Sequence, residues 1–138
     1  MNKNLLAITM ALLLLMTAAA SAQTVHMRAK VPFNFIVSGA TLPAGEYEIQ
    51  SFGAEPTLLL IRNLNSSNGT LVISNSRESL NASSHSKLVF HRYGERYFLA
   101  ELWVQGYNVG RQVTLSSRET EVAMDFPRSD VVLLMARR

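Results

Sequence analysis

Residues 87–104 read KLVFHRYGERYFLAELWV, and this stretch decides the predicted fold. Two β-type runs flank Tyr93-Gly94-Glu95, where either Tyr93-Gly94 or Gly94-Glu95 can form the loop of a β-hairpin. The two loops differ by two residues in register, so both leave every side chain on the same face. Neither face is wholly polar, and we therefore expect the hairpin to lie in the middle of a sheet rather than at its edge.

Strict alternation along both strands divides the side chains of this hairpin between two faces. One predicted face carries Leu88, Phe90, Arg92, Tyr97, Leu99, Glu101 and Trp103. The other predicted face carries Val89, His91, Tyr93, Arg96, Phe98, Ala100, Leu102 and Val104.

Short β-type runs continue on both sides of the hairpin, separated by residues that favour turns. The runs are 33–38, 46–50, 57–64, 70–74, 111–115 and 131–135, with turns at 42–45 and 106–110 and a longer loop at 75–86. This pattern contains no crossover helices between the runs, and their absence predicts that the strands pair antiparallel. We expect an all-β domain of eight or nine short strands, forming a single antiparallel β-barrel or β-sandwich.

The segment 116–126 carries two competing signals. Ser116-x-x-Glu119 matches a helix capping box, which would start a short helical turn. Val122, Met124 and Phe126 alternate with polar or small residues, which is the period of a strand. The alternation is the longer pattern, so we expect a strand here with at most one helical turn.

The N-terminus has the three-part layout of a secretory signal peptide. Lys3 is followed by the uncharged apolar run 5–19 and then by Ala20-Ser21-Ala22. We expect cleavage between Ala22 and Gln23, so that 1–22 is the signal peptide and 23–138 a single exported β-domain, periplasmic or secreted. The apolar run is shorter than the roughly 20 residues of a spanning helix, which favours a cleaved signal peptide over a membrane anchor. We therefore expect that the domain left after cleavage does not span a membrane. The chain contains no cysteine, and its apolar core must therefore hold it without disulfides.

Charge and motifs exclude several function classes. The net charge is +3, and it falls to +2 without the first 22 residues, which is too little for a nucleic-acid-binding surface. Catalytic motifs are missing, and we expect neither an enzyme nor a cofactor. Glu46 and Glu48 share one face of a predicted strand, which we interpret as a solvated face. His26, His85 and His91 lie in separate segments without ligand spacing, so no metal site is expected.

Basic and aromatic side chains gather between Lys87 and Tyr107. Arginine and aromatic rings together suit anionic groups, sugar rings or flat ligands. The candidate ligand-binding residues are His91, Arg92, Tyr93, Arg96, Tyr97, Trp103 and Tyr107. In the alternative interpretation the aromatic rings pack in the core, while Arg92 pairs with Glu95 or Glu101 across the hairpin.

Several phrases along the chain are also similar to those of a known family. They are Val31-Pro32-Phe33-x-Phe35, Leu42-Pro43-Ala44-Gly45-x-Tyr47, KLVF-x-RYG-x-x-YFL from Lys87, Trp103 and Ser117-Arg118-x-x-Glu121. Across about residues 31–121 the chain resembles a family of small exported proteins of unknown function that is frequent in acidobacteria. The resemblance implies a bacterial setting, in the cell envelope or secreted, and brings no catalytic or binding residues with it.

Two functional hypotheses follow. The first is a non-catalytic module of the cell envelope that binds a polysaccharide or a small amphiphile through the hairpin cluster. The second is a structural or assembly protein that pairs with itself or with an envelope protein through a sheet edge. The apolar run Val131 to Met135 motivates the second hypothesis, because it would need a neighbour at an edge.

Overall fold

The computed structural model describes residues 2–4, 25–54 and 57–135. The predicted cleavage site at Ala22 and Gln23 lies outside these residues, as does the apolar run before it. Every strand and every buried core side chain of the described part falls between Val25 and Met135. This region therefore holds a complete core of its own.

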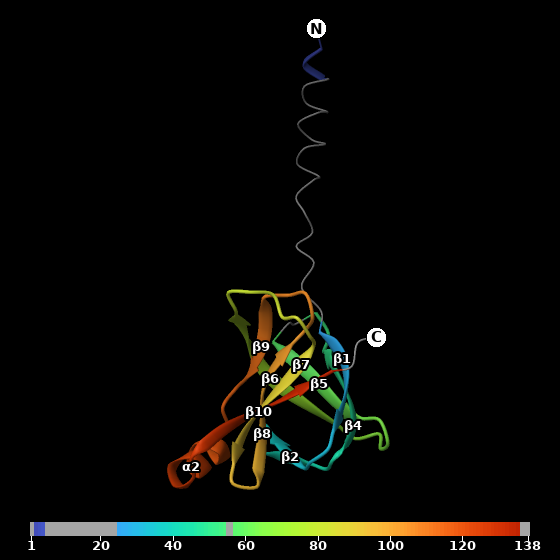
Figure 1. The fold of residues 1–138 in the computed structure, drawn as a ribbon. Coiled ribbons are helices and arrows are strands. Elements are labelled where there is room, and N and C mark those ends of the chain that lie inside the picture. Colours follow the sequence, from blue (N-terminus) through green and yellow to red (C-terminus); the bar gives the residue numbers. More distant parts are fainter. Residues whose placement is uncertain (1, 5–24, 55–56, 136–138) are drawn as a thin grey trace.

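Ten strands and the helix α2 make up this domain (Figure 1). The strands are β1 (His26–Val31), β2 (Phe35–Val37), β3 (Ala40–Leu42), β4 (Gly45–Ser51), β5 (Leu58–Asn63), β6 (Gly69–Glu78), β7 (Lys87–Tyr93), β8 (Arg96–Trp103), β9 (Val109–Val113) and β10 (Arg128–Leu134). The helix α2 spans Ser117–Asp125. The predicted all-β class is confirmed, with one more strand than the upper expectation.

The strands form one mixed sheet with the order β1-β4-β5-β6-β9-β8-β2-β3, while β7 pairs with β8 and with β10. Nearly all neighbours are antiparallel, but β2 runs parallel to β8, with Ile36 opposite Phe98. The expectation of a purely antiparallel sheet is therefore wrong at this pair. The sheet curls around the core (Figure 1), yet within the described residues β1 and β10 do not pair, so it does not close into a barrel.

The inner face of the curled sheet buries a continuous apolar core. In β1, for example, Met27, Ala29 and Val31 point inward while the residues between them are exposed. The ring of Phe35 packs edge-on against the rings of Tyr47 and Phe90, with centroid distances of 5.1 and 5.6 Å. Strand alternation thus provides the apolar burial that holds this cysteine-free chain together.

The predicted hairpin is confirmed, and it lies in the middle of the sheet. Tyr93 pairs with Arg96, so the loop is Gly94-Glu95, and Gly94 adopts a positive φ of 61°. On its outer sides β7 pairs with β10, while β8 pairs with β9 and β2.

A β-bulge changes the predicted faces of this hairpin. Phe90 pairs with Leu99, but the preceding Val89 pairs with Glu101, so Ala100 is an extra residue in β8. One extra residue reverses the inward and outward positions of everything beyond it. Leu102 therefore lies in the core beside Leu99. The predicted face is thus wrong for Leu102, and also for Glu101 and Trp103, which point outward opposite Val89 and Lys87.

Further segments differ from the sequence prediction, among them β3, which was not expected as a strand. The strand β1 was not expected, although its apolar residues alternate with His26, Arg28 and Lys30. The strand β6 continues to Glu78, four pairs into the predicted loop 75–86, because its polar end pairs with β9. Polar residues are tolerated there since the face they occupy is solvent-exposed.

The helix α2 replaces the strand predicted for 116–126. The Ser116 hydroxyl accepts a hydrogen bond from the Glu119 backbone N–H at 3.2 Å, which is the N-cap half of the capping box. Glu119 and Val122, three residues apart, are the buried positions of the helix. Met124 and Phe126, which suggested a strand, are 79% and 48% exposed, so their alternation did not reflect burial.

Candidate functional site

The outer face of the sheet formed by β8, β7 and β10 has one covered half and one open half. At the end where the β7–β8 hairpin turns, α2 packs over it, as Figure 1 shows. There Val122 of the helix joins Ile36, Tyr93 and Phe98 in a small apolar cluster. Toward the other end the same outer face is not covered by the helix, and this open half contains the candidate site.

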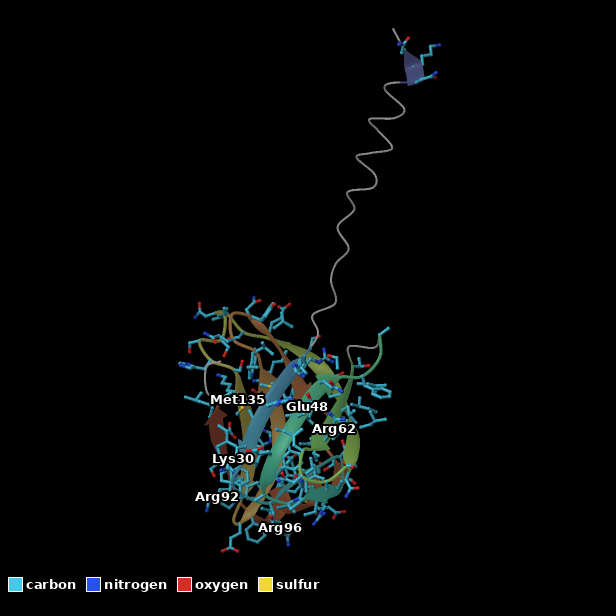
Figure 2. All side chains as sticks on the ribbon, turned by 90° about the vertical axis from the view of Figure 1, so that its right-hand side faces the viewer. Lys30, Glu48, Arg62, Arg92, Arg96 and Met135 are labelled. Atoms are coloured by element: carbon cyan, nitrogen blue, oxygen red, sulfur yellow. The ribbon has the colours of Figure 1, made fainter. Side chains whose placement is uncertain are left out.

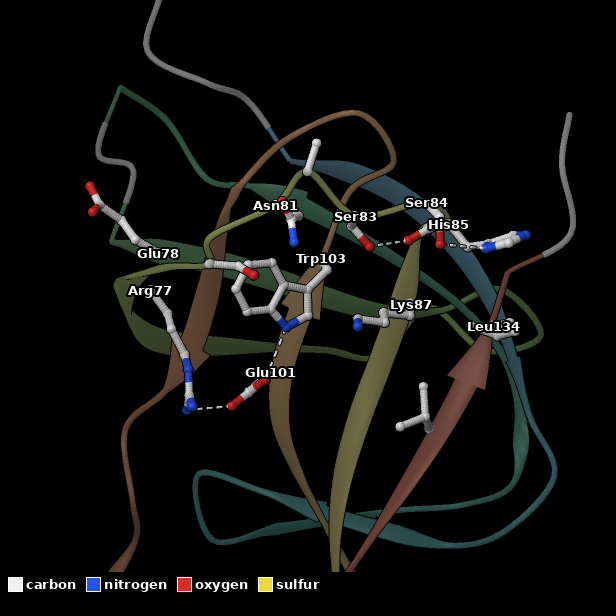
Figure 3. A pocket seen from close by; sticks show the side chains of 13 residues that line it. Arg77, Glu78, Asn81, Ser83, Ser84, His85, Lys87, Glu101, Trp103 and Leu134 are labelled. Atoms are coloured by element: carbon white, nitrogen blue, oxygen red, sulfur yellow. Dashed lines mark hydrogen bonds and ion pairs between the residues drawn. The ribbon is translucent and has the colours of Figure 1, made fainter.

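A pocket of about 440 Å³ occupies the open half (Figure 3). Its floor comes from β7, β8 and β10, and its rim from the segment 79–85 that follows β6. The side chains that give it chemical character are Arg77, Lys87, Glu101, Trp103, Val132 and Leu134. Because all six stand on paired strands, the sheet itself fixes their positions.

Trp103 is a fixed wall of this pocket. Its indole Nε1 donates to Glu101 Oε2 at 2.9 Å, and the side chain is only 6% exposed. On the other side Gly110 of β9 lies against the ring, where even an added Cβ would approach Trp103 Cε3 to 2.6 Å. The missing side chain at Gly110 therefore creates the space that Trp103 fills.

Charged groups surround the indole. Glu101 also binds the Arg77 guanidinium, with an Nη1–Oε1 distance of 2.5 Å. The Lys87 Nζ lies 5.8 Å from the centroid of the Trp103 ring, within the range of a cation–π contact. Glu101 thus accepts from two partners, and the pocket combines one neutralised ion pair, one ammonium and one aromatic ring.

The rim is polar and tied to the neighbouring turn 104–108. The Ser83 backbone N–H donates to the Tyr107 carbonyl, and the Gly106 N–H donates to the Ser83 carbonyl, both at 2.9 Å. The Ser84 hydroxyl lies 3.0 Å from His85 Nδ1. These short hydroxyl side chains offer a ligand both donors and acceptors.

His91 and Tyr93 belong to a different site, under α2. Glu119 Oε1 lies 2.6 Å from His91 Nδ1 and accepts from the Tyr93 hydroxyl at 3.1 Å. Burial, and secondarily the Glu119 charge, raise the pKa of Tyr93 above its ordinary value. Glu119 is itself 5% exposed, so this cluster fastens the helix to the sheet and is closed to ligands.

Arg92, Arg96 and Tyr97 gather at the turning end of the hairpin. Arg92 Nε donates to the Gly94 carbonyl at 2.7 Å, and its guanidinium carbon lies 5.5 Å from the Tyr97 ring centroid. Tyr97 stacks on Phe33 with a centroid distance of 3.9 Å. Arg96 is exposed in the strand end. No ion pair joins Arg92 to Glu95 or Glu101 among the described residues.

The structure therefore separates the candidate residues that the sequence grouped. Only Trp103 lies in the pocket, together with Lys87 from the same stretch. Tyr107 is 50% exposed in the turn beside the rim. Arg77, Glu101, Val132 and Leu134 were missed as site residues. The pairing of β10 with β7 and of β6 with β9 brings their strands together, and such long-range pairing leaves no local mark in the sequence.

Glu48 differs from the solvated carboxylate that the sequence suggested. It is 7% exposed and lies 2.9 Å from His26 Nε2, with Arg62 Nη2 at 2.5 Å on its other oxygen. Figure 2 shows Glu48 and Arg62 next to each other on the outer face of β4 and β5. The hydrogen bonds from His26 and then Arg62 lower the pKa of Glu48 below its ordinary value.

The described residues contain neither a cluster of metal-ligating side chains nor a membrane-spanning helix. Among the described residues, no three side chains of His, Cys, Asp or Glu converge on a point where they could hold a metal ion. The part of the chain that the structure describes also contains no helix long and apolar enough to cross a membrane.

Comparison of the chain with protein-family models, with curated proteins and with solved structures found no match. The resemblance to the exported acidobacterial family therefore stays a prediction, and so do export and the envelope location. The pocket is therefore the feature of the molecule that bears on function.

Proposed function

We propose that this protein is a non-catalytic binding module of the bacterial cell envelope, and that it holds a polysaccharide chain or a small amphiphile in the Trp103 pocket. One observation carries the proposal. An indole, an ion pair and exposed aliphatic side chains stand together on a rigid sheet, around a pocket of about 440 Å³.

The pocket lining suits a ligand that has both apolar and hydroxyl-rich surfaces. Val132 and Leu134 are 50% and 61% exposed and form an aliphatic side on β10. Across from them the Arg77–Glu101 pair and the serine rim offer donors and acceptors in fixed positions. Ligand sites are concave and combine apolar surface with placed polar groups. This pocket has both, and its polar lining residues outnumber the apolar ones.

A thermal-shift screen of residues 23–138 tests this proposal, because every described core residue lies within that segment. The panel contains neutral and acidic oligosaccharides and single-chain amphiphiles. A ligand at about 100 times its dissociation constant adds roughly 2.7 kcal/mol, which raises the unfolding midpoint by several degrees.

The variant Leu134→Asp identifies the site of any binding that is found. It places a charge on the aliphatic side of the pocket and should abolish the shift. Leu71→Asp is the matched control, since Leu71 is 49% exposed on β6 outside the pocket. Binding that survives Leu134→Asp, or a flat response to the whole panel, would argue against the proposal.

A sheet-edge assembly role is the second candidate, and the position of β10 favours it. β10 pairs with β7 on one side, while its other side carries no strand among the described residues. An exposed strand edge can pair with another chain. Multi-angle light scattering decides this point: a concentration-dependent dimer supports assembly, whereas a monomer at high concentration rejects self-assembly.

A further inference from the structure

We infer that the ligand of the Trp103 pocket carries a carboxylate and that Lys87 binds this group. The inference rests on the proposed function and narrows its ligand class. It follows from how the charges of the pocket are already paired.

Two other charged groups of the pocket, Arg77 and Glu101, are already paired with each other. Glu101 accepts from the Trp103 indole at 2.9 Å and from Arg77 at 2.5 Å. Arg77 and Glu101 therefore neutralise each other, and neither is the charge that a ligand would meet first.

Lys87 has no such partner. Among the described residues, no carboxylate lies within 4.0 Å of its ammonium, and its side chain makes no hydrogen bond. Its neighbours across the strands are Trp103 on β8 and Leu134 on β10, so the ammonium stands between an indole and an aliphatic side chain. Figure 3 shows Lys87 directed toward Trp103 at the pocket.

A partly desolvated ammonium gains most from an anionic partner. Its three N–H donors can bind a carboxylate through charge-assisted hydrogen bonds, which are stronger than neutral ones. Because no carboxylate of the described residues lies within ion-pair distance of the Lys87 ammonium, a ligand can supply one.

The surrounding acids limit how much negative charge the ligand can carry. Glu78 and Glu101 both line the pocket, and their charges would repel a doubly charged phosphate. Among the described residues, Lys87 is the cationic side chain of the lining without an ion-pair partner, and a single ammonium binds a single negative charge best. A carboxylate fits this balance, whether it belongs to a uronic acid or to a fatty acid.

Matched ligand pairs test the inference by isothermal titration calorimetry on residues 23–138. The sugar pair is galacturonate and its methyl ester, which differ by one negative charge but share the ring. The amphiphile pair is decanoate and decanol. We expect one of the two carboxylates to bind about tenfold or more tightly than its neutral partner, and which one does so identifies the source of the carboxylate.

Variants connect this preference to Lys87. Lys87→Gln should remove the preference, and Lys87→Arg should keep most of it because the charge remains. Lys30→Gln is the matched control, since Lys30 is an exposed lysine of β1 outside the pocket. High salt should weaken the preference in the unaltered protein.

The outcomes separate this inference from the proposed function. Equal binding of charged and neutral partners, abolished by Leu134→Asp, overturns the carboxylate inference and leaves the proposed binding function standing. A carboxylate preference that Lys87→Gln does not change also overturns it. Failure of all four ligands, together with a flat thermal-shift panel, removes both proposals.

Discussion

Replacing Gly110 by alanine is the sharpest test of how the Trp103 pocket is built. A Cβ at this position would lie 2.6 Å from Trp103 Cε3 and 2.7 Å from the Leu102 carbonyl oxygen. Ordinary van der Waals contact begins near 3.4 Å, so the new methyl group overlaps both a ring and a backbone atom. Gly110 has no positive φ, and the expected effect is therefore steric rather than conformational.

The magnitude follows from what has to move. The ring is packed against its neighbours and 6% exposed, so relief of the overlap shifts Trp103 away from Glu101. Overpacking a site of this kind costs about 1–3 kcal/mol, and the lost indole hydrogen bond costs about 1 kcal/mol more. We expect Gly110→Ala to destabilise the fold by about 3 kcal/mol and to lower the unfolding midpoint by roughly 10 °C.

Urea unfolding monitored by tryptophan fluorescence measures this directly, because Trp103 is the only tryptophan. The native emission of the variant should shift to longer wavelength if the ring moves toward solvent. Gly45→Ala is the matched control, since its added Cβ would meet Asn63 Nδ2 only at 3.6 Å. We expect that variant to be unchanged or up to about 1 kcal/mol more stable. If Gly110→Ala matched the wild type in both stability and emission, the described packing of Trp103 would be wrong.

Three further predictions concern the groups that hold the fold. Hydrogen bonds from His26 and Arg62 lower the pKa of Glu48, so the ionised Glu48 stabilises the fold fully above its ordinary pKa of 4.5, and this stabilisation is lost as pH falls through the lower folded-state pKa. In urea unfolding measured across acidic pH, Glu48→Gln should lose less stability on acidification than the wild type. Parallel stability curves would contradict the described contacts of Glu48 with His26 and Arg62. Glu119→Ala should destabilise by about 2 kcal/mol in urea, because it leaves buried partners of the carboxylate unpaired, and Glu119→Gln should recover part of the loss. Ser116→Ala removes the N-cap of α2 and should lower the free energy of unfolding by about 1 kcal/mol, as measured with urea. Ser117→Ala is the control, because Ser117 is the first residue of the helix and not its cap.

The hairpin shows how far alternation can be followed from the sequence. Apolar content and the Gly94 turn were enough to place β7 and β8 and to make them central. The side-chain faces were correct only up to Leu99, since a bulge depends on how two strands pair and leaves no local mark in either one. Trp103 was accordingly identified as a site residue but assigned to the wrong face.

The helix α2 illustrates the opposite error. Its local signal, the Ser116 cap with Glu119, was present and outweighed by a longer alternating pattern. That pattern had no structural meaning, because Met124 and Phe126 remain exposed. A short capped segment becomes helical when its buried stripe meets a surface, and the surface here is formed by Ile36, Tyr93 and Phe98.

By itself the sequence determined the all-β class, the central hairpin and the absence of disulfides. These properties depend on composition and on the two-residue period of strands, which are local. The tertiary structure alone decided three features. Among the described residues the sheet stays open between β1 and β10, α2 packs on the outer face at the turning end of the β7–β8 hairpin, and Arg77, Lys87, Glu101 and Leu134 meet around Trp103. These features arise between strands far apart in the chain, where register and packing decide which side chains become neighbours.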